Sequence, residues 1–100
     1  MENLPLKGIK VIDAASFIAA PLVSALMSDY GAEVIKIEPL TGDTYREAVI
    51  GGHVWPESEI DWAFILENRN KRSLSIDLKS KEGQLILKKL LKDTDVFVTN

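Results

Sequence analysis

The chain of 100 residues contains no cysteine and only one histidine. Without cysteine there is no disulfide framework, no thiolate metal site and no thiol nucleophile. No apolar run approaches the roughly 20 residues that a membrane-spanning helix needs. The first three residues, Met1, Glu2 and Asn3, also lack the basic start of a secretory signal. We therefore expect a cytoplasmic protein with no metal site and no membrane partner.

A strong excess of one charge is also missing. The chain has 12 lysines and arginines against 15 acidic residues, and its net charge is −3. Binding to the phosphate backbone of a nucleic acid requires a broad positive surface, so nucleic acid is not an expected partner. With 46% hydrophobic and 27% charged residues, the composition is that of an ordinary globular chain of one domain.

Short β-branched runs alternate along the chain with segments of helical spacing. The pattern predicts strands at residues 9–12, 33–38, 73–78 and 95–99, and helices at residues 17–30, 61–67 and 80–92. Pro21 suits a first helical turn, Gly31 suits the position just after a helix, and Ser80 suits an N-cap. Strands that alternate with helices predict an α/β fold with an open, mainly parallel sheet.

The stretch from residue 39 to residue 60 breaks this pattern with glycine, proline and small polar residues. Loops longer than about 12 to 15 residues are usually functional in compact domains. His53 lies in this loop, but no carboxylate or nucleophile at a telling spacing marks it as a general base. We expect a structural or solvent-exposed role for His53. In the short helix that follows, we expect three residues to face the core: Trp62, Phe64 and either Ile65 or Leu66.

Open parallel sheets bind ligands in the crevice outside the carboxyl ends of their strands. The turns after Asp13 and Glu38, the segment 76–79 and Asn100 all lie at such ends. Glu38 resembles the acid that binds a ribose hydroxyl in dinucleotide-binding proteins. The stretch between Asp13 and Pro21 contains no glycine, however, so a pyrophosphate cannot approach the backbone in the G-x-G-x-x-G manner. NAD and FAD are therefore not expected.

Four short sequence motifs follow one another along the chain: GAEVIKIE at 31–38, GDTYR at 42–46, NKRS at 70–73 and IDLK at 76–79. In this order and spacing they resemble the N-terminal signature of the family III coenzyme A transferases, the CaiB/BaiF-like group that includes formyl-CoA transferases. The resemblance implies a Rossmann-like domain that binds CoA without the glycine fingerprint. It also implies that residues 1–100 are the N-terminal part of that domain in a longer protein. The family forms interlocked homodimers, and a heteromer is the alternative.

The resemblance also implies which residues contact CoA. Carried over one by one, the family's contacts fall on Ile18, Ala19, Ile76, Asp77, Leu78, Lys79 and Asn100. Lys79 is the principal candidate, because the phosphates of CoA need cationic donors. Asp77 is expected to accept hydrogen bonds from the backbone or the ligand rather than to act as an acid catalyst.

Supporting charges are expected from Arg69, Lys71 and Arg72, which lie shortly before this segment. One position departs from the family, because some members carry an arginine directly after the second strand where this chain has Pro39. Arg46 is the candidate to replace the lost contact.

The activity implied by the resemblance is transfer of CoA between a thioester and a carboxylic acid, through an aspartyl mixed anhydride and an enzyme-bound CoA thioester. The family's nucleophilic aspartate lies beyond Asn100. No catalytic residue is therefore assigned within this span, which is expected to be inactive alone. CoA is a substrate here, and no permanently bound cofactor is expected. Three readings stay open: a transferase, closest to the aryl-lactate or hydroxy-acid branch; an α-methylacyl-CoA racemase of the same fold; and a non-catalytic partner subunit.

Overall fold

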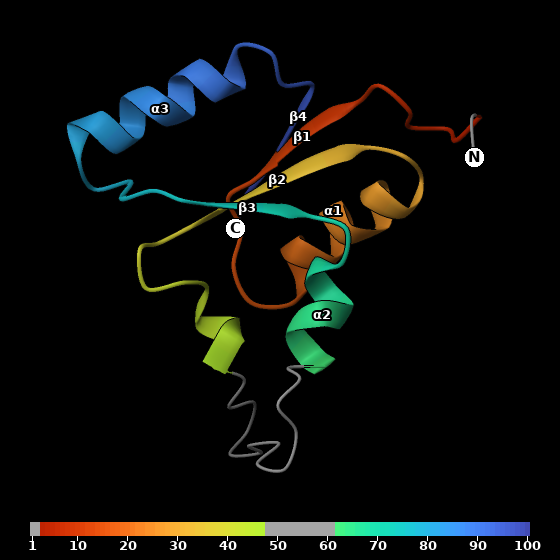
Figure 1. The fold of residues 1–100 in the computed structure, drawn as a ribbon, viewed down its shortest axis with the longest axis horizontal. Helices are drawn as coiled ribbons and strands as arrows, with labels where there is room; N and C mark the ends of the chain where they lie inside the picture. Colours follow the sequence, from red (N-terminus) through yellow and green to blue (C-terminus); the bar gives the residue numbers. More distant parts are fainter. Residues whose placement is uncertain (1–2, 48–61) are drawn as a thin grey trace.

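The computed structural model describes residues 3–47 and 62–100. Within them, the strands are β1 (Lys10–Asp13), β2 (Glu33–Glu38), β3 (Arg72–Ser75) and β4 (Val96–Val98). The helices are α1 (Ala19–Asp29), α2 (Trp62–Asn68) and α3 (Lys81–Leu91), and the 3-10 helix η1 (Thr44–Glu47) follows β2. The strands form one sheet in the order β3-β2-β1-β4, and every pair is parallel (Figure 1). The predicted open parallel sheet is confirmed, in the strand order of Rossmann folds.

Most elements match their predicted bounds within one or two residues, but two differences bear on function. Phe17 cannot begin α1, because its φ of 74° is left-handed. The third strand ends at Ser75 rather than at residue 78. The N–H of Ile76 still donates to the carbonyl of Glu38 at 2.9 Å, but β2 ends at Glu38, so no partner strand continues the ladder. Residues 76–79 therefore form a turn at the end of β3. His53 lies outside the described residues.

Different helices cover the two faces of the sheet. Figure 1 shows α1 and α2 on one face and α3 on the other. Successive residues of β1 serve the two faces, because side chains alternate along a strand. Val11 packs with Val34 and with Met27 of α1, whereas Ile12 packs with Ile37 beneath Leu90 of α3. The core thus consists of two apolar layers separated by the sheet.

Helix α3 is anchored where the sheet meets the candidate site. The side-chain oxygen of Ser80 accepts the N–H of Gly83 at 3.0 Å, which confirms the predicted N-cap. Gly83 is buried, and a Cβ built there would lie 1.9 Å from the carbonyl oxygen of Asp77. Only a residue without a side chain allows α3 to approach the turn at residues 76–79 this closely.

Several apolar side chains of α1 and α2 point outward rather than into the core. The exposed fraction is between 45% and 60% for Val23, Leu26, Ile65 and Leu66. The expectation that Ile65 or Leu66 faces the core is therefore wrong. None of the helices among residues 3–47 and 62–100 is long and apolar enough to cross a membrane.

Candidate functional site

A pocket of about 530 Å³ lies at the carboxyl ends of β1, β2 and β3. Three segments line it: residues 14–16 after β1, residues 37–41 with 43 and 44 at and after the end of β2, and residues 76–79 after β3. This is the edge at which open parallel sheets bind their ligands, and the volume is typical of a small-molecule site.

The predicted contact residues divide into two groups. Residues 76–79 all line the pocket, whereas Ile18, Ala19 and Asn100 do not. Asn100 instead holds a residue that does: its side-chain oxygen accepts the N–H of Ser16 at 3.1 Å, and its amide donates to the carbonyl of Ser16 at 2.9 Å. Ile18 is the N-cap residue of α1, and Ala19 is the helix's first residue.

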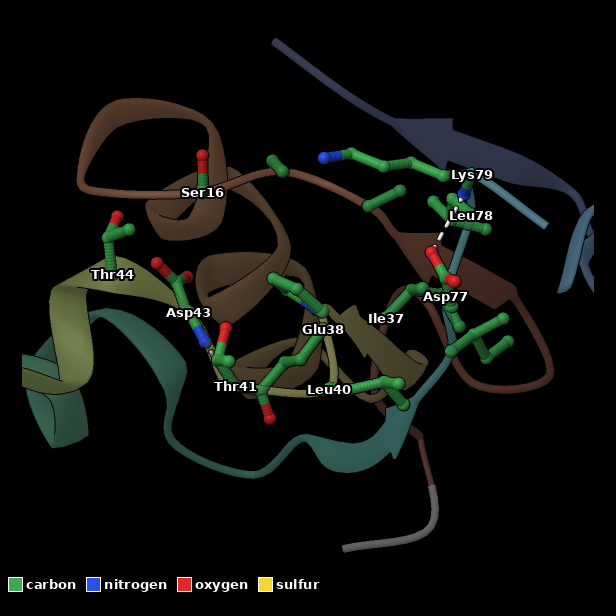
Figure 2. Close-up of a pocket in the computed structure, with 14 residues that line it drawn as sticks. Ser16, Ile37, Glu38, Leu40, Thr41, Asp43, Thr44, Asp77, Leu78 and Lys79 are labelled. Carbon is green, nitrogen blue, oxygen red and sulfur yellow. Dashed lines mark hydrogen bonds between the residues drawn. The ribbon is translucent and has the colours of Figure 1, made fainter.

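Lys79 is the one cationic side chain among the described residues that line the pocket. Figure 2 shows this side chain extending over the pocket, with Asp43 and Thr44 on the opposite side. The carboxylate of Asp77 accepts the N–H of Lys79 at 3.0 Å, so Asp77 is a backbone acceptor, as predicted. Leu78 adds an apolar wall. The pocket thus combines one positive charge with apolar surface and with the carboxylates of Glu38, Asp43 and Asp77.

Glu38 also lines the pocket, and both of its carboxylate oxygens accept hydrogen bonds from neighbouring residues. One oxygen accepts the N–H of Asp43 at 3.0 Å and Nε of Arg46 at 2.6 Å. The other accepts Nη2 of Arg46 at 2.9 Å and the hydroxyl of Ser73. Burial raises the pKa of Glu38, but these hydrogen bonds outweigh that effect and lower the pKa to about 2. With four donors already bound, the carboxylate has no acceptor site left for a ribose hydroxyl.

The charges expected to support Lys79 lie elsewhere. Lys71 is buried: its ammonium donates to Asp13 at 2.7 Å and to Asn68 at 2.8 Å. Burial lowers the pKa of Lys71, and the contact with Asp13 partly restores it. Arg69 pairs with Asp29 at 2.6 Å. The expectation of a supporting charge is wrong for Lys71, because its ammonium is enclosed between the sheet and the helices.

Arg72 faces a second, smaller cavity of about 210 Å³, which is also lined by Lys10 and Glu33. These two residues begin β1 and β2, so the cavity lies at the amino ends of the strands, away from the pocket. Among residues 3–47 and 62–100, no group of His, Asp or Glu side chains could hold a metal ion.

The model of CoA-transferase family III matches residues 6–100. The chain belongs to CoA-transferase family III. The (R)-2-hydroxy-4-methylpentanoate CoA-transferase of Clostridioides difficile is 52% identical over 97 residues, which are 95% of this chain and 24% of that protein. The succinyl-CoA–L-malate CoA-transferase alpha subunit of Chloroflexus aurantiacus is 39% identical over 100 residues, which are 99% of this chain and 23% of that protein.

A solved structure shares the fold. The CAIB/BAIF family protein from Brucella suis superposes with a TM-score of 0.83 at 34% identity, over 99% of this chain and 26% of that one. The chain therefore spans about a quarter of the length of the relatives it matches.

In this family III chain, Arg46 does not occupy the place left by Pro39. Its guanidinium pairs with Glu38 and lies 4.1 Å from the ring centroid of Phe64, and Arg46 is not among the residues that line the pocket. Pro39 itself lines the pocket. The described residues thus provide an apolar surface at the position where the family resemblance implies an arginine in some members.

Sequence reasoning missed a buried ion pair beside the pocket. Nζ of Lys36 lies 2.8 Å from the carboxylate of Asp43, and both side chains are 1% exposed. Lys36 and Glu38 alternate with apolar residues along β2, a strand that helices cover on both faces. Charged residues at such positions must be paired, so the alternation itself was a usable signal.

Proposed function

We propose that the protein carrying this chain is a CoA transferase, which moves CoA between a thioester and a carboxylic acid, and that the pocket is part of its CoA site. One observation carries the proposal. Residues 76–79, which the family resemblance assigns to CoA contact, line a pocket at the carboxyl edge of a parallel sheet. In this proposal, residues 1–100 form the N-terminal part of the CoA-binding domain.

The pocket supplies a cationic donor and apolar surface, two of the features that a CoA site needs. CoA presents a pyrophosphate, a ribose 3′-phosphate and an adenine ring. The ammonium of Lys79 supplies a charge-assisted donor for a phosphate. Leu40 and Leu78 supply apolar surface for the adenine. Asn100 contributes through Ser16, which it holds by two hydrogen bonds.

The remaining assigned residues, Ile18 and Ala19, would contact CoA at the start of α1, where the chain leaves the pocket.

The chemistry itself needs a carboxylate nucleophile outside this span. That carboxylate attacks the donor thioester and expels CoA thiolate, which leaves a mixed anhydride. The thiolate then attacks the anhydride at the enzyme's carbonyl carbon, which releases the donor acid and leaves an enzyme-bound CoA thioester.

The acceptor carboxylate next attacks this thioester and again expels CoA thiolate. The thiolate finally attacks the acceptor's own carbonyl and frees the enzyme carboxylate.

The acceptor that we propose is a 2-hydroxy acid, because the two relatives reported above are named for such acids. We also propose a cytoplasmic dimer. The alpha-subunit name of one relative makes a heteromer the alternative to a homodimer.

The binding test uses the full-length protein, with Lys79→Met compared against Lys81→Met. Lys81 begins α3 two residues later, is exposed and does not line the pocket. By calorimetric titration with CoA, we expect Lys79→Met to weaken binding about tenfold or more and Lys81→Met to change it less than about twofold. Equal affinities for the two variants would remove Lys79 from the site, and a wild-type protein that binds no CoA would refute the proposal.

The reaction class has its own test. The full-length protein is incubated with a panel of acyl-CoA thioesters, treated with hydroxylamine or borohydride, and analysed by mass spectrometry. A trapped carboxylate adduct is the expected result and would identify the donor. Exchange of α-deuterium into the thioester without an adduct would instead indicate a racemase, and neither signal would indicate a non-catalytic subunit.

A further inference from the structure

A single buried ammonium connects two sides of the pocket. Nζ of Lys36 donates to the carbonyl oxygen of Ala15 at 3.1 Å and lies 2.8 Å from the carboxylate of Asp43. Ala15 belongs to the β1 loop (residues 14–17) and Asp43 to the β2 loop (residues 39–44), and both residues line the pocket. Figure 2 shows Ser16 and Asp43, one from each loop, beside the same pocket. Lys36 itself does not line it.

Asp43 extends this connection along both loops. Its second carboxylate oxygen accepts the N–H of Tyr45 at 2.9 Å and the N–H of Phe17 at 3.4 Å. Phe17 has a φ of 74°, and its ring packs on Tyr45 with centroids 5.3 Å apart. A bulky residue keeps such a backbone only where its surroundings hold it. The Lys36–Asp43 pair is therefore part of what determines the shape of the β1 loop.

The Lys36–Asp43 pair is expected to add little net stability to the fold. Removing two charges from water costs free energy that their attraction often does not return, and an apolar pair of similar volume commonly serves stability as well or better. A buried pair at this point therefore calls for a reason other than stability. Holding two loops at a fixed separation is a reason that the contacts of Lys36 supply.

The same fold contains a natural comparison. Nζ of Lys71 lies 2.7 Å from the carboxylate of Asp13, and the two side chains are 2% and 0% exposed. The other partners of Lys71 are the carbonyl of Pro21 and the side chain of Asn68, on α1 and α2. The pocket is not lined by any of the four residues involved, which are Lys71, Asp13, Pro21 and Asn68. The other oxygen of Asp13 accepts the N–H of Ala15 at 2.9 Å, so this pair also reaches the β1 loop. The two lysines are alike in burial and pairing, but Lys36 connects the β1 loop to the β2 loop, whereas Lys71 connects β1 to α1 and α2.

We propose that Lys36 is a positioning residue of the CoA site, which sets the separation of the β1 and β2 loops through Ala15 and Asp43. This inference rests on the proposed function, because it takes the pocket to be where CoA binds. Lys36 does not touch CoA. Its removal should therefore reduce affinity by letting the two loops move apart, and not by removing a charge that the ligand meets.

The test compares Lys36→Met with Lys71→Met in the full-length protein. Each replaces a buried ammonium by an apolar side chain and leaves a buried aspartate, so both should lower the melting temperature. For CoA measured by calorimetric titration, we expect an affinity loss of about tenfold or more for Lys36→Met and of less than about threefold for Lys71→Met. Comparable losses in the two variants, or no loss in Lys36→Met, would overturn the proposal.

A double variant separates positioning from general destabilisation, and it decides the matter if Lys36→Met does not fold. Lys36→Met with Asp43→Asn removes the orphan charge but keeps a side-chain oxygen that can accept from Tyr45 and Phe17. Its melting temperature should recover toward the wild-type value while its CoA affinity stays low. Recovery of both together would show that affinity followed stability, and the proposal would then be wrong.

Hydrogen exchange gives a readout that does not depend on CoA. Lys36→Met should speed exchange in peptides that cover residues 14–17 and 39–46. Lys71→Met should leave the peptide that covers residues 39–46 at the wild-type rate. Only this peptide separates the two variants, because Asp13, the partner of Lys71, is hydrogen-bonded to Ala15 of the β1 loop. If the wild-type protein binds no CoA, the proposed function fails, but this comparison still decides whether Lys36 holds the loops. Unchanged exchange in both peptides of Lys36→Met would overturn the positioning role.

Discussion

At the scale of single residues, the sheet face beneath α1 and α2 carries charges where a parallel sheet usually carries aliphatic side chains. Asp13, Lys36 and Glu38 are each no more than 3% exposed. Each is paired with a residue from a loop or from another element, so each ties a further segment to the carboxyl edge of the sheet. Glu38 lines the pocket, whereas Asp13 and Lys36 do not line it and hold the segments around it.

Glu38 makes this arrangement sensitive to acid. Its pKa is about 2 in the folded protein against an ordinary value of 4.5, so its contribution to stability is complete above pH 4.5 and is lost as the pH falls toward 2. Glu38→Gln should lower the free energy of unfolding at pH 7 by about 2 kcal/mol. This value is smaller than the pKa shift alone would give, because Arg46 is partly exposed and solvent screens its interaction with Glu38. The deficit should shrink between pH 4.5 and pH 2, as measured by denaturant unfolding at a series of pH values.

Glu82→Gln is the matched control, because Glu82 is exposed in the first turn of α3. Its unfolding free energy should stay close to the wild-type value throughout. A deficit for Glu38→Gln that is as large at pH 3 as at pH 7 would show that the hydrogen bonds to Glu38 do not depend on its charge.

At the scale of elements, the contact between α3 and the turn at residues 76–79 joins the fold to the site. The turn follows the last ladder bond between β3 and β2, and α3 begins directly after it with Ser80 as N-cap. Because Gly83 lies against the carbonyl of Asp77, the position of the helix determines where Asp77 and Lys79 stand. The site segment is thus held from both ends.

Gly83→Ala tests this contact through the sign of its effect. In an exposed helix interior, alanine in place of glycine stabilises by about 1 kcal/mol. Here the added methyl would lie 1.9 Å from the oxygen of Asp77, so we expect the free energy of unfolding to fall by about 3 kcal/mol, measured by denaturant titration. Lys88→Ala, at an exposed position of the same helix, should change stability by less than about 0.5 kcal/mol. A more stable Gly83→Ala protein would contradict the packing described.

At the scale of the whole molecule, the fold leaves apolar surface uncovered on both sides of the sheet. Val23, Leu26 and Leu66 lie outward on the α1 and α2 side, and Leu85 with Phe97 lies outward elsewhere. Both β3 and β4 are edges of the four-stranded sheet. Contiguous apolar surface and open strand edges are places where proteins associate.

The chain of 100 residues should therefore self-associate when it is produced alone. Sedimentation velocity across a range of concentrations should show an apparent mass that rises with concentration. Replacing Val23 and Leu26 by serine should reduce this rise with little loss of stability, because both side chains are about half exposed. A monomer at every concentration would contradict the expectation, and Lys88→Ser serves as the polar control.

Local pattern alone was enough to predict most elements of this fold. The β-branched run at residues 33–38 and the capped helical pattern at residues 80–92 agree with β2 and α3, because periodicity and capping are properties of neighbouring residues. Once these elements were predicted, the carboxyl ends of the strands, where such sheets bind ligands, could be predicted as well. The ordered motifs then pointed to residues 76–79, and the structure places those four residues at the pocket.

Only the tertiary structure decided which side chains are enclosed. Lys71 looks like part of a surface run in the sequence, yet it is buried against Asp13, which lies 58 positions away. Leu26 has the spacing of a core residue, yet it faces outward while Ser24 is buried. Burial depends on how crossing helices lie over the sheet, and the Lys36–Asp43 pair forms only once the loop after β2 folds back against that strand. The sequence by itself determined the elements and the family, whereas the packing between elements decided which charges build the pocket.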